Sequence, residues 1–173
     1  MADKNKTGIT GSTQQNVEQF LYKQADILDQ RNWDAWLNLF TKDGKYWMPA
    51  KPDQETGEGV PNIFYEDRYL MDMRIRRVEH PYAHSQKAGH RTSHVVSNVM
   101  IQSEDAENGE LVCTSRFHMV EYRLEDQRYF GGKYTHNLER IDNSVNMENV
   151  KNHTLEMVKM ADQGGFNIVW AAE

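Results

Sequence analysis

The sequence predicts an α+β fold, a cone in which a curved antiparallel sheet wraps around helices segregated on one of its faces. Two observations predict this fold. Between residues 17 and 78 apolar residues recur every three to four positions, which is the helical period. From Arg91 onward the period falls to two, which is that of a strand. Helices followed by a run of strands are typical of α+β domains.

The length of 173 residues fits one domain. Residues 1–11 are polar and are expected to form a flexible N-terminal arm, and residues 12–173 to form the single cone domain, with an apolar C-terminal tail at 166–173. Neither an apolar leader stretch near residue 1 nor a run of about 18 apolar residues is present in the sequence. We therefore expect a cytoplasmic protein without a membrane span.

Charge and cysteine content exclude several classes of function. Lys and Arg number 20 against 26 Asp and Glu, for a net charge of −6, so a nucleic acid backbone or an anionic membrane would be repelled. The chain has one cysteine, Cys113. One cysteine cannot form an internal disulfide or a cysteine-rich zinc site, and iron–sulfur clusters take four Cys or, in Rieske centres, two Cys and two His.

Two helices are expected near the N-terminus. Ser12 and Gln15 have the spacing of a capping box, so the first helix should begin there and present an apolar stripe. Asn32 can cap a second helix whose apolar stripe runs from Trp33 to Phe40. The stripe of the first helix contains one polar residue and consists of Val17, Phe20, Leu21, Gln24 and Leu28.

The middle of the chain predicts a turn at 41–44, an edge strand at 45–48 that ends at Pro49, and an exposed loop over 50–62. A third helix is expected over 64–78. Acidic residues stand at its start and arginines at its end, which complements the helix dipole. Asp72 and Arg76 are spaced to form an ion pair.

Four long antiparallel strands are expected from Arg91 onward. The alternation places Thr92, His94, Val96, Asn98 and Met100 on one face of the first strand, and Val95, Ser97, Val99 and Ile101 on the other. Asn-Gly at 108–109 predicts a hairpin to a strand over 111–124. A third strand is expected over 129–141, with a bulge or bend at the Gly pair 131–132, and a last one over 154–160.

A cone of this kind can enclose a pocket in which an acid and a histidine act on a small ligand. His94, His118 and His136 alternate with apolar neighbours on adjacent strands and are candidates to point inward together, although satisfied sheet histidines are the commoner case. His90 and His94 are four apart on a strand, about 13 Å, which is too far to share a metal ion. We therefore nominate neither catalytic nor metal-binding residues.

Several short blocks of the sequence resemble the small (β) subunit of aromatic-ring-hydroxylating dioxygenases, particularly the benzoate and aminobenzoate type. The resemblance covers about residues 16–141, and its blocks at 32–50 and 91–99 are specific. The matching runs are FLY at 20–22, LD at 28–29, NWDAWL at 32–37, YWMPA at 46–50, FYEDR at 64–68, RI at 74–75, RTSH at 91–94 and SNV at 97–99.

The resemblance implies the cystatin-like or nuclear-transport-factor-like cone fold and a chain that carries no cofactor of its own. It implies a large (α) subunit that holds the Rieske [2Fe-2S] cluster and the mononuclear Fe(II), and a hexamer of three large and three small chains. The complex would use NADH and O₂ to convert an aromatic ring to a cis-dihydrodiol. The role left for this chain is assembly and stability of the oxygenase.

Candidate contacts with other subunits are Arg74 and Arg77 of the third helix, and Phe166 and Trp170 of the apolar tail. Instead of contacting another subunit, the arginines could lie on a solvent-exposed face of the helix. The apolar tail could pack on the sheet of its own chain. The rival function is a stand-alone cone-fold isomerase or dehydratase that uses His94 with a nearby acid on a small ligand.

Overall fold

The computed structural model describes residues 12–83, 90–140 and 149–158, the last of these by its backbone alone. The arm 1–11, the tail 166–173 and the candidates Phe166 and Trp170 lie outside the described residues. The elements are α1 (Thr13–Asp29), α2 (Trp33–Leu37), β1 (Phe40–Pro49), β2 (Asn62–Asp67), α3 (Arg68–Glu79), β3 (Arg91–Asp105), β4 (Glu110–Arg123), β5 (Asp126–Glu139) and β6 (Asn149–Val158).

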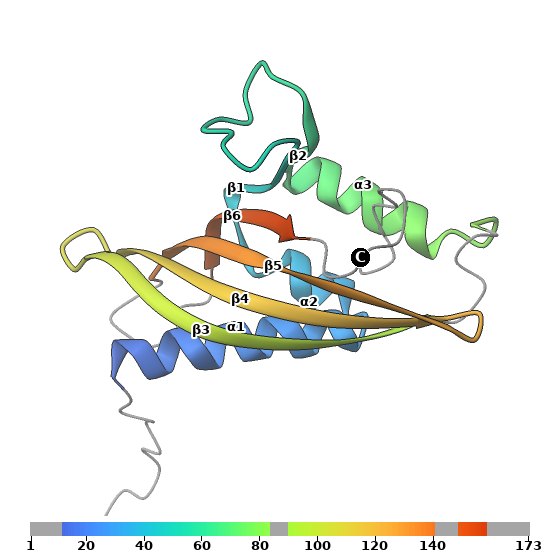
Figure 1. Ribbon diagram of the computed structural model, residues 1–173. Coiled ribbons are helices and arrows are strands. Elements are labelled where there is room, and N and C mark those ends of the chain that lie inside the picture. The colour runs from blue at the N-terminus through green and yellow to red at the C-terminus, as the bar shows by residue number, and fades with distance from the viewer. Residues whose placement is uncertain (1–11, 84–89, 141–148, 159–173) are drawn as a thin grey trace, which may run out of the picture.

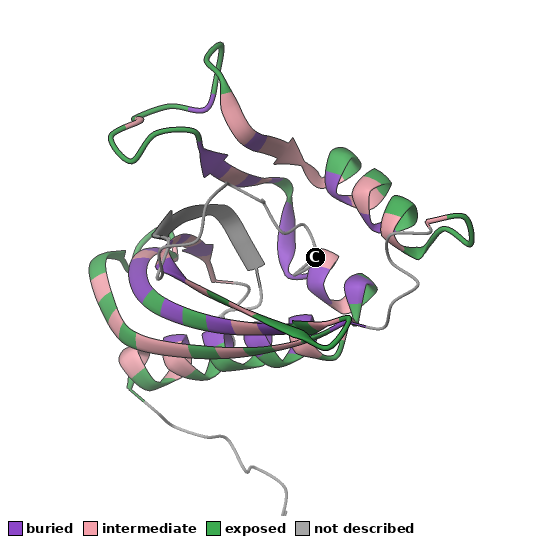
Figure 2. Cartoon of the chain, turned by 45° about the vertical axis from the view of Figure 1, so that its right-hand side comes forward, coloured by how far each residue is buried: buried purple, intermediate pink, exposed green. Residues whose placement is uncertain are grey.

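The six strands form one sheet in the order β2-β1-β6-β5-β4-β3. The long strands β3, β4 and β5 curve over α1, while β2 and α3 lie at the other end of the sheet order (Figure 1). Buried and exposed residues alternate along these strands (Figure 2), so one face of each is turned inward. The predicted α+β cone is confirmed, but the sheet is mixed, because β1 and β6 are parallel.

Helix α1 forms as the sequence predicts. The Ser12 hydroxyl accepts a hydrogen bond from the Gln15 backbone, and the Gln15 side chain accepts one from the Ser12 backbone, at 3.4 and 3.0 Å. The two bonds satisfy amide groups that a helix start otherwise leaves without partners. The buried stripe that follows faces the sheet and consists of Val17, Phe20, Leu21, Gln24, Ala25, Ile27 and Leu28.

The predictions for residues 40–67 are partly wrong. Residues 41–44 lie inside β1 rather than in a turn, and β1 is an inner strand between β2 and β6 rather than an edge strand. Pro49 is tolerated because it ends the strand at a register shift. Residues 62–67 form β2 and not the first turns of a helix, and the third helix begins only at Arg68, where the Asp67 side chain caps it.

Aromatic packing explains why β2 overrides the helical spacing. Phe64 is buried and its ring lies 4.6 Å from that of Tyr46 on β1. Tyr46 and Phe40 in turn pack edge-on against Trp36 at 5.4 and 5.0 Å. These contacts join α2, β1 and β2 at one edge of the sheet, and each buried aromatic side chain contributes about 2–3 kcal/mol from burial alone.

A bulge in β3 changes the predicted faces of that strand. Asn98 has φ of +52°, and between Ser97 and Met100 two residues of β3 stand opposite one of β4. Asparagine tolerates this left-handed conformation better than most residues. Beyond the bulge, Val99 and Ile101 pack on the core while Met100 is 56% exposed, the reverse of the simple alternation.

The hairpins follow local sequence where turn chemistry is strong. Asn-Gly at 108–109 connects β3 to β4 as predicted, with Gly109 at φ of +70°. The predicted bulge at the glycine pair 131–132 is wrong, because β4 and β5 pair there without a register shift.

The turn between β4 and β5 is the site of a stability prediction. Leu124 and Glu125 both have positive φ, 51° and 64°, as a two-residue type I′ turn requires, although neither residue favours that conformation. Leu124 is 72% exposed, so little burial is lost on substitution. We expect Leu124→Asn with Glu125→Gly to raise the free energy of unfolding by about 1 kcal/mol or more, as measured by urea titration. An unchanged or lower stability would show that these residues contribute contacts beyond the turn.

Candidate functional site

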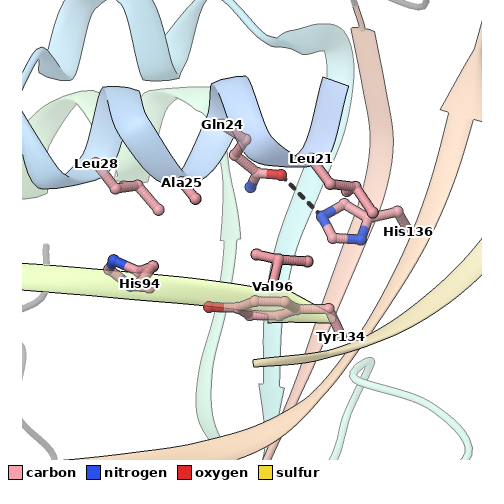
Figure 3. A pocket seen from close by; sticks show the side chains of 8 residues that line it. All are labelled: Leu21, Gln24, Ala25, Leu28, His94, Val96, Tyr134 and His136. Atoms are coloured by element: carbon pink, nitrogen blue, oxygen red, sulfur yellow. Dashed lines mark hydrogen bonds between the residues drawn. The ribbon is translucent and has the colours of Figure 1, made fainter. Parts of the chain in front are cut away.

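The inner face of the sheet and α1 enclose a small pocket. Leu21, Gln24, Ala25 and Leu28 come from α1, and the facing side chains come from β3 and β5 (Figure 3). The facing residues are His94, Val96, Tyr134 and His136. The pocket therefore contains two of the three histidines that the sequence placed inside the cone.

Asp29, the last residue of α1, organises one side of this pocket. Its carboxylate accepts hydrogen bonds from the Thr92 hydroxyl and from the backbone amide of His94, both at 2.8 Å. It also contacts Nδ1 of His94 at 2.6 Å. Burial by itself would raise the pKa of Asp29, but the bonds from His94 and Thr92 together hold that pKa below its usual value. Asp29 is therefore an ionised acid that ties the end of α1 to β3.

His136 occupies the other side of the pocket, on β5. Its Nε2 lies 2.9 Å from Oε1 of Gln24, an oxygen that can only accept, so Nε2 carries the hydrogen. The ring is 1% exposed, and burial lowers the pKa of His136 to about 3. His136 is consequently neutral at physiological pH.

His118, His90 and His80 do not join this group, and the side chain of His153, which stands opposite His136 in register on β6, lies outside the described residues. His118 points outward from β4 and is exposed, because β4 turns its odd-numbered residues inward at this point. His90 is buried just before β3, and His80 is exposed at the end of α3. His84 lies outside the described residues.

Sequence reasoning missed Gln24 as a lining residue of the pocket and Asp29 as the acid that is bonded to His94 beside it. Gln24 had a visible signal, since it is the polar member of an otherwise apolar helical stripe. Asp29 had none beyond its place at the end of that stripe. The predicted core positions Trp33 and Trp36 are buried, and Trp47 is partly buried with its indole nitrogen donating to Asn62 at 2.6 Å.

The chain has too few cysteines for a Rieske cluster, and the residues that the structure describes do not fit a mononuclear iron. Cys113 is the only cysteine, and burial raises its pKa to about 12, so it is a thiol rather than a thiolate ligand. Within residues 12–83 and 90–140, no three His, Cys, Asp or Glu side chains are grouped so that they could hold a metal ion. The one acid–histidine pair of the pocket, Asp29 and His94, has its facing atoms bonded to each other.

The pocket is too small for an organic substrate. Its volume is about 10 Å³, close to the roughly 10–15 Å³ that one enclosed water molecule needs. Leu21, Val96 and Tyr134 fill the space between the polar groups (Figure 3). Asp29 and His94 could exchange a proton with a water molecule, but an aromatic ring has no room beside them.

The predicted interface arginines differ in their surroundings. Arg74 is mostly buried, pairs with Glu66 of β2 and lies over the ring of Phe64 at 5.1 Å. Arg77 is exposed on α3. The predicted pair of Asp72 and Arg76 is confirmed at 2.7 Å. Arg74 therefore fixes α3 to β2 within the chain, whereas Arg77 is accessible to another molecule.

Replacing Asp29 tests its structural role. In Asp29→Asn, the amide group offers one oxygen where the carboxylate accepts three hydrogen bonds, so one or two buried donors lose their acceptor. We expect a loss of about 1–3 kcal/mol in the free energy of unfolding, measured by chemical denaturation. Asp53→Asn, in the exposed loop, removes the same charge and should change stability by less than about 0.5 kcal/mol. Equal effects of the two substitutions would contradict the role of Asp29.

His136 should make the protein sensitive to acid. Its pKa of about 3 in the folded chain lies below the usual histidine value of 6.5, so protonation favours the unfolded state and stability is lost as pH falls below about 6.5. Between pH 7.5 and 5 this loss amounts to about 2 kcal/mol. His136→Gln should lose less stability over that interval in urea titrations, and the control His118→Gln should follow the parent protein. The same pH dependence in all three proteins would rule out a neutral His136.

Known proteins resemble this chain over most of its length. A family model described as the ring-hydroxylating beta subunit matches residues 23–156. The small oxygenase component of the p-cumate 2,3-dioxygenase system of Pseudomonas putida is 31% identical over 135 residues, which cover 77% of this chain and 74% of the relative. The beta subunit of benzoate 1,2-dioxygenase of Acinetobacter baylyi is 30% identical over 125 residues, covering 68% and 72%.

Solved structures share the fold. The beta subunit of the benzoate 1,2-dioxygenase of Burkholderia mallei superposes with a TM-score of 0.69 at 22% identity, over 82% of this chain and 88% of that one. A chain of naphthalene 1,2-dioxygenase gives 0.72 at 15% identity, over 90% and 85%. At such identities these likenesses show the fold alone. The match of the family model and the two relatives at 30% identity or more carry the assignment: the chain belongs to the family of ring-hydroxylating dioxygenase beta subunits.

Proposed function

We propose that this chain is the non-catalytic small subunit of an oxygenase that cis-dihydroxylates an aromatic acid or hydrocarbon, and that it serves the assembly and stability of that complex. The observation that carries the proposal is the small size of the pocket between α1 and the sheet. That pocket has room for about one water molecule, and His94, which lines it, is bonded to Asp29. A substrate has no room in this pocket, which supports a role for the surface of the chain.

The redox chemistry then belongs to the large subunit. A Rieske cluster needs two Cys and two His, and this chain has one cysteine, which is buried. The large subunit would hold that cluster and a mononuclear Fe(II), with electrons from NADH delivered through a reductase. Three large and three small chains would form the hexamer, in the cytoplasm where the reductant is made.

The substrate class is proposed from the family. Related small subunits belong to dioxygenases of p-cumate, benzoate and benzene, so both aromatic acids and aromatic hydrocarbons occur. No described side chain of this chain selects between them, since the pocket admits neither. Selection of the ring would therefore rest with the large subunit.

The rival function is an isomerase or dehydratase built on the same cone. A chain of Novosphingobium aromaticivorans assigned as a scytalone dehydratase has this fold, with a TM-score of 0.62 at 15% identity. A shared fold does not carry a shared reaction. The acid–histidine pair favours this rival, but the 10 Å³ pocket opposes it.

Co-purification tests the proposal. A tagged small chain expressed with the Rieske-type large subunit encoded beside it should elute with it as one complex on gel filtration. The isolated small chain should contain less than about 0.1 iron per chain by metal analysis. Separate elution of the two subunits, or stoichiometric iron in the isolated small chain, would contradict the proposal. The rival function instead requires ligand binding by the isolated chain.

A further inference from the structure

The outer face of the sheet carries an exposed aromatic and basic surface. Near the β4–β5 turn, the side chains that point away from α1 include Val95 and Tyr129, 60% and 59% exposed, and Tyr122, 38% exposed. Cross-strand register makes them neighbours, because Val120 stands opposite both Ser93 and Tyr129. We call this surface the outer patch. Its members are Arg91, Ser93, Val95, Arg116, His118, Val120, Tyr122, Gln127, Tyr129, Gly131 and Lys133.

The outer patch has a charge opposite to that of the chain. Arg91, Arg116 and Lys133 belong to it, and the guanidinium of Arg91 lies 5.8 Å from the ring centre of Tyr122. None of its members is an Asp or a Glu, although the chain as a whole carries a net charge of −6. Glu121, between Val120 and Tyr122, points to the inner face and is buried, whereas Glu156 of β6 stands opposite Lys133 at the border of the patch. Exposed aromatic side chains beside arginine are typical of the centres of protein interfaces.

We propose that the outer patch is the docking surface for the large subunit, and that the large subunit meets it with an apolar centre edged by carboxylates. This inference rests on the proposed function and adds to it which face of the chain binds the large subunit. Charge complementarity sets the partner's chemistry, because Arg91, Arg116 and Lys133 outnumber Glu156, the acid that stands opposite Lys133, and so attract an acidic surface. The apolar centre of the patch requires a partner that also supplies apolar area.

A second copy of this chain fits less well. Outer patches of neighbouring copies that met each other around the axis of the hexamer would bring Arg91, Arg116 and Lys133 against like charges. The acidic loop at 51–60 of another copy could supply carboxylates, from Asp53, Glu55 and Glu58. However, Val60 is the only large apolar side chain described as exposed in that loop, which is too little to cover Tyr122 and Tyr129.

Charge reversal in the assembled oxygenase tests the inference. Arg116→Glu and Tyr129→Ser lie on the outer patch, and Lys51→Glu in the exposed loop matches the charge change of the first variant. We expect each patch variant to raise the Kd for the large subunit about tenfold or more, by surface plasmon resonance, with the effect of Arg116→Glu shrinking at high salt. Lys51→Glu should bind as the parent does. Thermal melts of each isolated variant check that the fold is kept.

Two outcomes would overturn the inference. Parental affinity for the large subunit in both folded patch variants would show that docking occurs elsewhere. Loss of self-association of the small chain, with binding of the large subunit intact, would assign the outer patch to contacts between copies. Failure of the parent chain itself to bind any large subunit would instead overturn the proposed function, and the inference with it.

Discussion

The attachment of α1 to β3 is the constraint on which the rest of the structure depends. Asp29 receives three hydrogen bonds from Thr92 and His94 at one end of the helix, and the side chain of Gln14 donates to the backbone oxygen of Val99 at the other, at 3.0 Å. Fifteen helical residues span about 22 Å and seven strand residues about 23 Å. The helix and the strand therefore have nearly the same length between these two points of attachment. A third attachment, the hydrogen bond between Gln24 and His136, joins α1 to β5.

Because α1 is held at both ends, its apolar stripe fills the cone. An open cone of this shape can hold a ligand beside an acid and a histidine, whereas here Leu21, Leu28 and Tyr134 occupy that space. The acid–histidine pair then works as a structural tie rather than as a proton-transfer device. Since this pocket has no room for a substrate, the proposed function rests on the exposed surface of the chain. This accounts for an acidic, rather polar chain that displays aromatic and basic side chains on one face of its sheet.

Local signals in the sequence predicted most helices and strands. The predictions failed where contacts between residues distant in the sequence determine the structure. The capping box at Ser12, the Asn-Gly hairpin and the alternation after Arg91 depend on neighbouring residues and were confirmed. Strand β2 was missed because Phe64 has helical spacing to Met71 but packs on Tyr46, far from it in sequence. For the pocket, alternation predicted His94 and His136, but the partners Asp29 and Gln24 are set by the approach of α1 to the sheet, which no local pattern encodes.

The central claim is that this chain supports the oxygenase without taking part in its chemistry. The most direct test replaces His94, whose Nδ1 is bonded to Asp29, with Asn and measures product formed per iron-loaded, fully assembled complex. The account predicts turnover per assembled complex equal to that of the parent, even where the yield of complex falls. A complex of normal composition and iron content that has lost its turnover would contradict it.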